Sequence, residues 1–228
     1  MSVELLHIDC MEYMATQPDK AFDLAIVDPP YGIGWDREDV GMSAGIRKDG
    51  TQRKQESWSN PIPKGYANKE WDNNTPGKEY FEELMRVSRK QIIWGGNYFS
   101  EYLQPSGGWV TWEKGVPDGM SLSQCELAWT NCRNSVRHIR LLWSGYMKCE
   151  KTDRQHPTQK PIKLYEWLLT NYAKPGQRIL DTHLGSGSSA IAAYYYGVDF
   201  VGCELDKDYF EAAKKRFEQH TTQLGMSL

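Results

Sequence analysis

A short apolar run stopped by two consecutive prolines constrains the fold of this chain more than any other feature. Residues 22–27 read Phe-Asp-Leu-Ala-Ile-Val, which is typical of a buried strand, and Asp28-Pro29-Pro30-Tyr31 follows directly. Each proline lacks a backbone donor and holds φ at about −65°, so the strand has to end there. A carboxylate and an aromatic ring are thus presented where open α/β sheets bind ligands. Taken alone, the tetrapeptide is explained equally well by a rigid turn with a core tyrosine.

The rest of the chain alternates between strand and helix patterns. This alternation predicts an α/β fold with a mostly parallel sheet and helices on both faces. At 228 residues the chain suits one domain, which we assign to residues 1–228. The expected strands are 3–8, 23–28, 91–94, 108–114, 124–131, 178–180 and 199–204, and the expected helices are 10–17, 80–89, 161–172, 188–196 and 206–219.

Two polar segments, at about 36–76 and 132–155, interrupt this alternation. We expect both to be irregular, and each contains a local basic excess although the net charge of the chain is −3. They are interpreted either as solvated loops or as variable segments that face a polyanion. The candidate contacts to a polyanion are Arg47, Lys48, Arg53, Lys54, Arg133, Arg137 and Arg140.

Cysteine usage and the terminal sequence bound the cellular setting. The five cysteines form no Cys-x-x-Cys pair, which argues against a zinc site or a disulfide framework and favours a reducing cytosol. The first residues lack a signal-peptide pattern, and no apolar run approaches membrane-spanning length. We therefore expect a cytoplasmic protein with no metal and no membrane partner.

A second motif follows the expected strand 178–180. It reads Asp-Thr-His-Leu-Gly-Ser-Gly over residues 181–187, and its glycines allow the backbone to approach a ligand closely. Glu204 ends the next strand, where an acidic side chain can bind both hydroxyls of a ribose or, alternatively, cap the following helix. Asp181 disfavours a pyrophosphate and suits an ammonium group. A ligand with a ribose, an amino acid and a positive centre fits S-adenosylmethionine better than NAD.

Together, the two motifs and His156-Pro157-Thr158-Gln159-Lys160-Pro161 resemble the β class of amino-group DNA methyltransferases. The order is diagnostic, because Asp-Pro-Pro-Tyr precedes the cofactor loop in this class. The resemblance implies a Rossmann-like, circularly permuted fold. Its sheet would be mostly parallel and seven-stranded, with one antiparallel strand. The implied cofactor-binding residues are Asp9, Cys10, Asp28, Thr158, Lys160, Asp181, His183, Gly185, Gly187, Ser188, Glu204 and Leu205. Many relatives have Asp-Pro-Phe where this chain has Asp-Thr-His, which leaves open the packing role of the ring at His183.

The resemblance assigns the target base to Asp28, Pro29, Pro30 and Tyr31. Asp28 and the Pro29 carbonyl would accept hydrogen bonds from an exocyclic amino group, and Tyr31 would stack on a base flipped out of double-stranded DNA. The implied activity is transfer of a methyl group from S-adenosylmethionine to adenine N6. Cytosine N4 is the alternative, and Asp in place of the Ser common in cytosine enzymes favours adenine. Less favoured are a glutamine or RNA methyltransferase and a non-catalytic DNA-binding partner. The two basic segments named above would supply the contacts to DNA phosphates. The class is often dimeric, so a homodimer is an expectation, and the compact size suits an enzyme of a phage-infected cell as well as a bacterial one.

Overall fold

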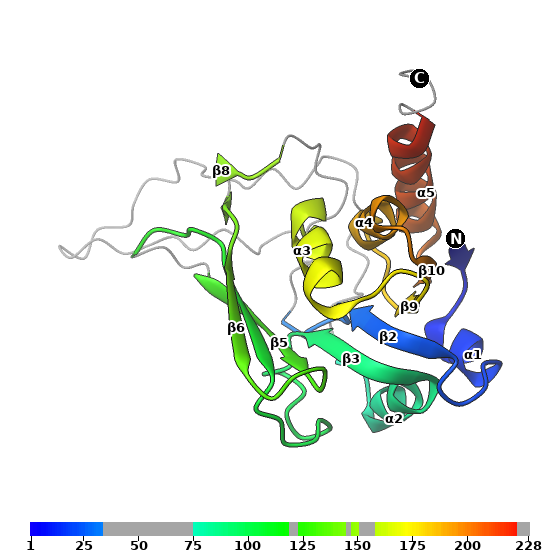
Figure 1. The fold of residues 1–228 in the computed structure, drawn as a ribbon, viewed down its shortest axis with the longest axis horizontal. Helices are drawn as coiled ribbons and strands as arrows, with labels where there is room; N and C mark the ends of the chain where they lie inside the picture. The colour runs from blue at the N-terminus through cyan, green and yellow to red at the C-terminus, as the bar shows by residue number, and fades with distance from the viewer. Residues whose placement is uncertain (34–74, 119–122, 145–146, 151–157, 223–228) are drawn as a thin grey trace, which may run out of the picture.

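The computed structural model describes residues 1–33, 75–118, 123–144, 147–150 and 158–222, and its main feature is one large mixed sheet (Figure 1). The sheet has eight strands in the order β1-β10-β9-β2-β3-β5-β4-β6. They are β1 (Val3–His7), β2 (Phe22–Val27), β3 (Ser88–Trp94), β4 (Trp109–Glu113), β5 (Cys125–Thr130), β6 (Val136–Arg140), β9 (Arg178–Asp181) and β10 (Asp199–Glu204). A separate two-stranded ribbon joins β7 (Trp143–Ser144) to β8 (Met147–Lys148).

The strand pairing confirms the mostly parallel sheet and corrects its size. Within the described residues, β5 alone runs against its neighbours, and the other seven strands share one direction. The sheet has eight strands rather than the expected seven, because β6 lies in a segment predicted to be irregular. The β6 sequence Val-Arg-His-Ile-Arg buries only Ile139, so it shows no apolar alternation. It is nevertheless ordered as an edge strand through backbone pairing with β4.

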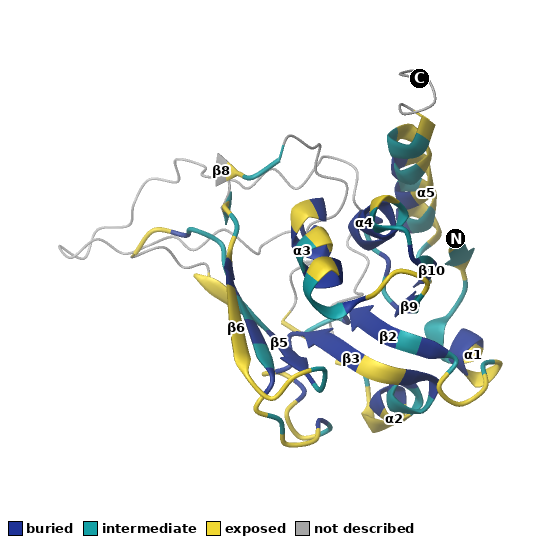
Figure 2. Cartoon of the chain, in the orientation of Figure 1, coloured by how far each residue is buried: buried dark blue, intermediate teal, exposed yellow. Residues whose placement is uncertain are grey.

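Helices cover both faces of the sheet, as the sequence predicts (Figure 1). One face carries α3 (Ile162–Tyr172), α4 (Ser188–Tyr196) and α5 (Lys207–Thr222), and the other carries α1 (Cys10–Ala15) and α2 (Lys78–Val87). Successive strand residues alternate between the two cores. Ile92 packs toward α3 and α4, while Ile93 packs toward α1 and α2. Figure 2 shows the result, with buried strands between amphipathic helices.

The connections leave a switch point between two central strands, β9 and β2. From β9 the chain passes through α4 to β10 on one side, whereas from β2 it passes through α2 to β3 on the other. Open α/β sheets bind ligands at such a point, beyond the carboxyl ends of the strands. Because β5 is antiparallel, its first residues also lie at this edge. Among the described residues, no helix combines the length and apolar character needed to cross a bilayer.

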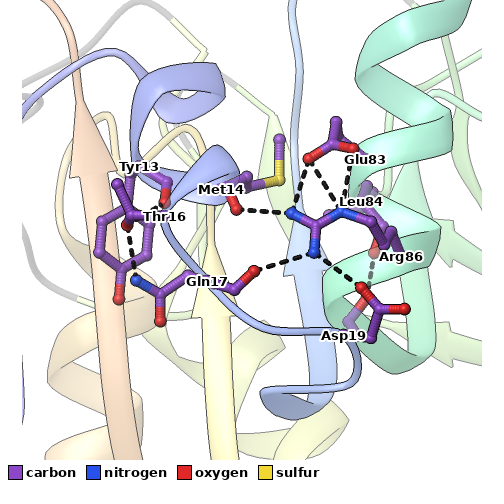
Figure 3. A network of polar contacts seen from close by, with 9 residues as sticks. Tyr13, Met14, Thr16, Gln17, Asp19, Glu83, Leu84 and Arg86 are labelled. Carbon is purple, nitrogen blue, oxygen red and sulfur yellow. Dashed lines mark hydrogen bonds and ion pairs between the residues drawn. The ribbon is translucent and has the colours of Figure 1, made fainter.

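A polar cluster far from that edge joins α1 to α2 (Figure 3). We call it the Arg86 cluster. The guanidinium of Arg86 donates to the carbonyl oxygens of Met14 and Gln17 at 2.8 and 2.9 Å. It also donates to the carboxylates of Asp19 and Glu83 at 2.9 and 2.8 Å. The last carbonyls of a helix lack partners within it, so Arg86 closes the end of α1 while holding α2 beside it.

Candidate active site

The Pro-Pro turn places a largely buried carboxylate at the end of β2. Asp28 follows Val27 directly, and the buried Pro29 continues the turn. Asp28 Oδ1 accepts a hydrogen bond from the hydroxyl of Tyr31 at 2.6 Å. Asp28 Oδ2 accepts one from Nζ of Lys160 at 2.5 Å. Both oxygens of this carboxylate are therefore engaged by the protein.

Lys160 lies at the centre of a larger charged group, which we call the Lys160 cluster. Its side chain is only 4% exposed, and its ammonium also lies 3.2 Å from Glu126 Oε2 and 3.2 Å from the hydroxyl of Tyr31. Lys114 in turn donates to Glu126 Oε1 at 3.0 Å. The cluster thus contains two ammonium groups, two carboxylates and one phenol, which are Lys114, Lys160, Asp28, Glu126 and Tyr31.

Burial and charge pairing set the protonation states within this cluster. Burial raises the pKa of Asp28, and the nearby Lys160 ammonium opposes that rise. Burial also acts to raise the pKa of Glu126, but attraction to Lys160 and Lys114 outweighs it and holds the pKa below its ordinary value. Burial acts to lower the pKa of Lys160, yet Asp28 and Glu126 together raise it. Lys160 is consequently a charged ammonium that is hydrogen-bonded to Asp28 and faces Glu126.

Aromatic rings surround the carboxylate. The ring of Tyr31 stacks on that of Tyr98, with centroids 5.1 Å apart and an interplanar angle of 18°. Its other contacts include the edge of Phe99 at 6.1 Å. Gly95 has φ of +70°, and a Cβ there would overlap the Tyr31 ring, so glycine is required for this approach. Tyr98 is 43% exposed and was not predicted by the sequence analysis as part of the site.

The Gly-rich loop of residues 182–187 follows β9, which is the strand next to β2. Asp181 is buried, with Oδ1 accepting from the His183 amide at 3.0 Å and Oδ2 from the Ser189 hydroxyl at 2.5 Å. Burial raises the pKa of Asp181 to about 7. Gly187 caps α4 with φ of +74°, a conformation that side chains disfavour.

Glu204 connects this loop to the end of β10. Its Oε2 accepts from the Gly185 amide at 2.8 Å, and its Oε1 accepts from the Asp206 amide at 3.0 Å. Burial raises the pKa of Glu204. The carboxylate therefore holds the loop and the start of α5 together, and its contact with a ribose stays a prediction. Leu205 follows and is 66% exposed, leaving an apolar side chain beside the loop.

The remaining predicted cofactor residues have clear structural settings. Asp9 caps α1 by accepting from the Met11 amide at 2.7 Å, and burial raises the pKa of the Cys10 thiol to about 12. The His183 ring packs edge-on against Tyr80 at 5.5 Å, so it supplies the ring packing that the sequence left open. Burial lowers the pKa of His183 to about 4. Thr158 lies one residue past an undescribed segment, and Lys160 lies on the Asp28 side of the edge.

The predicted DNA contacts separate into three groups. Arg47, Lys48, Arg53 and Lys54 lie outside the described residues. Arg133 donates to the Asn171 carbonyl at 2.9 Å, and Arg137 to the Asn171 side chain at 3.4 Å, at the far end of α3. Arg140 ends β6 at the carboxyl edge, where it is 66% exposed and lies 3.1 Å from Glu113.

Sequence reasoning missed three charged residues that shape this edge. Lys114 follows β4 and Glu126 lies at the start of β5, so the polar residues at the facing ends of the expected strands 108–114 and 124–131 were the available signal. Arg216 is 4% exposed and donates to the Ser186 carbonyl at 2.8 Å and the Ser188 hydroxyl at 2.9 Å. Arg216 thereby stabilises the Gly-rich loop. No sequence signal indicated this role, because Arg216 is one of many polar residues in the helix expected there.

Comparison with known proteins agrees with this architecture. A sequence model of a family described as "DNA methylase" matches residues 114–215. The type II methyltransferase M2.DpnII of Streptococcus pneumoniae is 26% identical, over 94% of this chain and 89% of the relative. M2.MboI of Moraxella bovis, also named a type II methyltransferase, is 22% identical, over 95% and 88%.

Two solved structures share the fold at low sequence identity. The structure of an M1.HpyAVI–SAM complex superposes with a TM-score of 0.58 at 20% identity, covering 94% of this chain and all (100%) of that one. The PvuII DNA methyltransferase, described as cytosine-N4-specific, gives 0.60 at 12% identity, covering 97% and 91%. The fold and its two motif-bearing strand ends define a Rossmann-like methyltransferase. In sequence, the chain is similar to DNA methyltransferases, over residues 114–215 for the family model and over most of its length for the two type II relatives.

Proposed function

We propose that this protein transfers a methyl group from S-adenosylmethionine to the N6 amino group of adenine in DNA. One observation carries the proposal. The Asp28 carboxylate is held at the end of β2, on the strand next to β9 and its Gly-rich loop. A site for an exocyclic amine thus adjoins a site suited to the methyl donor, at the switch point of the sheet.

The residues at the end of β9 and β10 fit S-adenosylmethionine chemically. Glu204 offers acceptor oxygens for ribose hydroxyls, and the exposed Leu205 offers an apolar surface for adenine. Asp181, with its loop glycines, suits the amino-acid part, because an ammonium group favours the ionised carboxylate. When bound, the cofactor supplies an electrophilic methyl group. The contacts predicted for Asp9, Cys10, Thr158, His183 and Ser188 belong to this proposal.

Asp28 positions the target nitrogen in this mechanism. The lone pair of an exocyclic amine is delocalised into the base, so the nitrogen is a poor nucleophile. By accepting one N–H of the amino group, with the Pro29 carbonyl accepting the other, Asp28 favours a more tetrahedral nitrogen. The nitrogen then displaces sulfur at the methyl carbon and afterwards loses a proton. The contribution is orientation and electrostatic stabilisation.

The target base has to leave the duplex for this chemistry, since a stacked base is out of reach. Tyr31 provides the stacking surface, and Tyr98 extends it with an exposed ring. Phosphate contacts would come from the basic segment near 36–76 and from Arg140 at the carboxyl edge. A homodimer stays a prediction.

The test is methylation of unmodified genomic DNA, followed by sequencing that detects modified bases. We expect N6-methyladenine within one short motif, and none with Asp28→Ala, which should still bind S-adenosylmethionine in calorimetry. Cytosine N4 is the second candidate, favoured by the fold shared with the cytosine-N4-specific PvuII enzyme. N4-methylcytosine would select that candidate, and unmodified DNA would overturn both.

A further inference from the structure

Glu126 faces Lys160 with an acceptor oxygen that has no hydrogen bond. Glu126 Oε2 is buried and lies 3.2 Å from Lys160 Nζ, yet no donor among the described residues makes a hydrogen bond to it. The same ammonium lies 2.5 Å from Asp28 Oδ2. Lys160 is therefore bound to one carboxylate and lies within reach of a second that has spare acceptor capacity.

The two carboxylates differ in how firmly they are anchored. Glu126 lies on β5, which pairs with both β3 and β4, and Lys114 fixes its other oxygen at 3.0 Å. Lys160 directly precedes Pro161, the N-cap of α3. Its side chain, by contrast, has four rotatable carbons and three equivalent donors. A short swing of the Lys160 ammonium is the simplest rearrangement this cluster permits.

The proposed chemistry gains from such a rearrangement, because a carboxylate oxygen already bound to an ammonium is a weaker acceptor for an amino group. Both oxygens of Asp28 already accept hydrogen bonds, from Tyr31 and Lys160. An incoming amino group needs one of them as its acceptor. Release of Lys160 without a partner would leave a buried ammonium uncompensated, which is costly. A second carboxylate within reach of the same ammonium removes that cost.

We propose that Glu126 is a positioning residue of the target-base site, which takes over Lys160 as the amino group of the base reaches Asp28. Glu126, anchored by Lys114, holds the ammonium close enough to keep Asp28 ionised while one Asp28 oxygen turns to the base. This inference rests on the proposed function, and it adds a role that acts through Lys160 rather than by contact with substrate.

The sign of the effect of Glu126 on the pKa of Asp28 follows from the titratable and charged groups that face the Asp28 carboxylate. These are Tyr31 from its own turn, Lys160 before α3, Tyr165 on α3, Glu126 on β5, Tyr80 on α2 and Asp181 at the end of β9, with Lys114 behind Glu126. Burial raises the pKa of Asp28, Lys160 lowers it and Glu126 raises it. Removing Glu126 and removing Lys160 should therefore shift that pKa in opposite directions.

The experiment measures methyl transfer to DNA as a function of pH for the wild type, Glu126→Gln, Glu126→Asp and Lys160→Gln. Activity requires ionised Asp28, so the acid limb of kcat follows its pKa. We expect Glu126→Gln to lower the plateau kcat by roughly tenfold to a hundredfold, because Lys160 stays on Asp28. Its acid limb should move to lower pH, whereas that of Lys160→Gln should move to higher pH. Glu126→Asp keeps the charge and should restore the wild-type limb.

Glu83→Gln is the matched control, since it removes a carboxylate from a cation outside the site. It should leave the plateau and the limb unchanged, and the Glu83 and Glu126 variants should bind S-adenosylmethionine like the wild type. An active wild type with an unmoved acid limb in Glu126→Gln would overturn the inference. A wild type that methylates no DNA would instead overturn the proposed function. If Glu126→Gln does not fold, Lys114→Gln tests the same anchor, and an unchanged plateau kcat there would contradict the role.

Discussion

Arg86 and Lys160 each lie between two carboxylates, but their surroundings differ. Arg86 is 30% exposed and also donates to two backbone carbonyls at the end of α1. Lys160 is 4% exposed, and its described partners are the carboxylates of Asp28 and Glu126 and the Tyr31 hydroxyl. The planar guanidinium fixes several groups at once, whereas a single ammonium can be shared and transferred.

The two cations differ in the acceptors that they bind. Arg86 binds backbone carbonyls as well as acidic side chains, whereas Lys160 binds side chains at the candidate site. Backbone carbonyls cannot move without the helix, so a cation bound to them stabilises one conformation. Acidic side chains can change protonation or rotamer, so a buried cation between them couples to chemistry. In this molecule the first arrangement lies away from the carboxyl edge and the second lies at it.

The largest expected difference between the two clusters appears when one carboxylate charge is removed from each. Asp28→Asn should reduce methyl transfer by at least about a hundredfold, because the amide cannot offer the same acceptor charge to the amino group. Asp19→Asn removes the corresponding partner of Arg86 and should leave transfer unchanged. Rates with saturating DNA and cofactor measure both. Near-normal transfer by Asp28→Asn would remove the distinction between the clusters.

Exchanging the two cations tests the comparison directly. Lys160→Arg should lower kcat by about tenfold or more, since a planar fork does not fit between two buried carboxylates without displacing Asp28. Arg86→Lys should leave kcat unchanged and lower the midpoint of thermal unfolding by a few degrees, because the ammonium cannot reach both carbonyls and both acids. Steady-state kinetics and calorimetric unfolding give the two readouts. Equal loss of activity in both variants would contradict the division.

Parts of the site could be predicted from sequence because local signals fix them. Apolar runs marked β2 and β9, and the residues that end them, Asp28 and Asp181, were placed correctly at the carboxyl edge. The Gly-rich loop and the helix after it also follow from local chemistry, since Gly187 adopts the left-handed conformation that such a turn requires.

The remaining features depend on distant packing. Lys160 and Asp28 are 132 positions apart, and their contact depends on how the segment before α3 docks on the sheet. Arg216 looks like one more polar residue of an amphipathic helix until α5 brings it under the loop. The sequence of β6 shows no strand pattern of its own, because this edge strand is ordered by backbone pairing with β4.

Asp181 gives a pH test of the cofactor half. Burial raises its pKa from 3.8 to about 7, so in the free protein its neutral form stabilises the fold, and that stability is lost as pH rises between these values. A cationic ligand favours the ionised form, so affinity for S-adenosylmethionine should rise with pH through about 7, by at most about tenfold per pH unit. Calorimetry at several pH values measures this. Asp181→Asn should bind more weakly without pH dependence, whereas Asp19→Asn should keep it.

The smallest expected effect is a loss of DNA affinity, and it is tested by comparing two arginines, Arg133 and Arg140. Arg133 contacts the carbonyl of Asn171 near the end of α3, as Arg86 does for α1, whereas Arg140 is exposed at the carboxyl edge. Arg140→Gln should weaken DNA binding a few-fold and reduce the salt dependence of log K by about one, as loss of one phosphate contact does. Arg133→Gln should leave DNA affinity unchanged and lower the unfolding midpoint instead. Fluorescence anisotropy at several salt concentrations separates the two, and equal losses of affinity would place Arg133 among the DNA contacts.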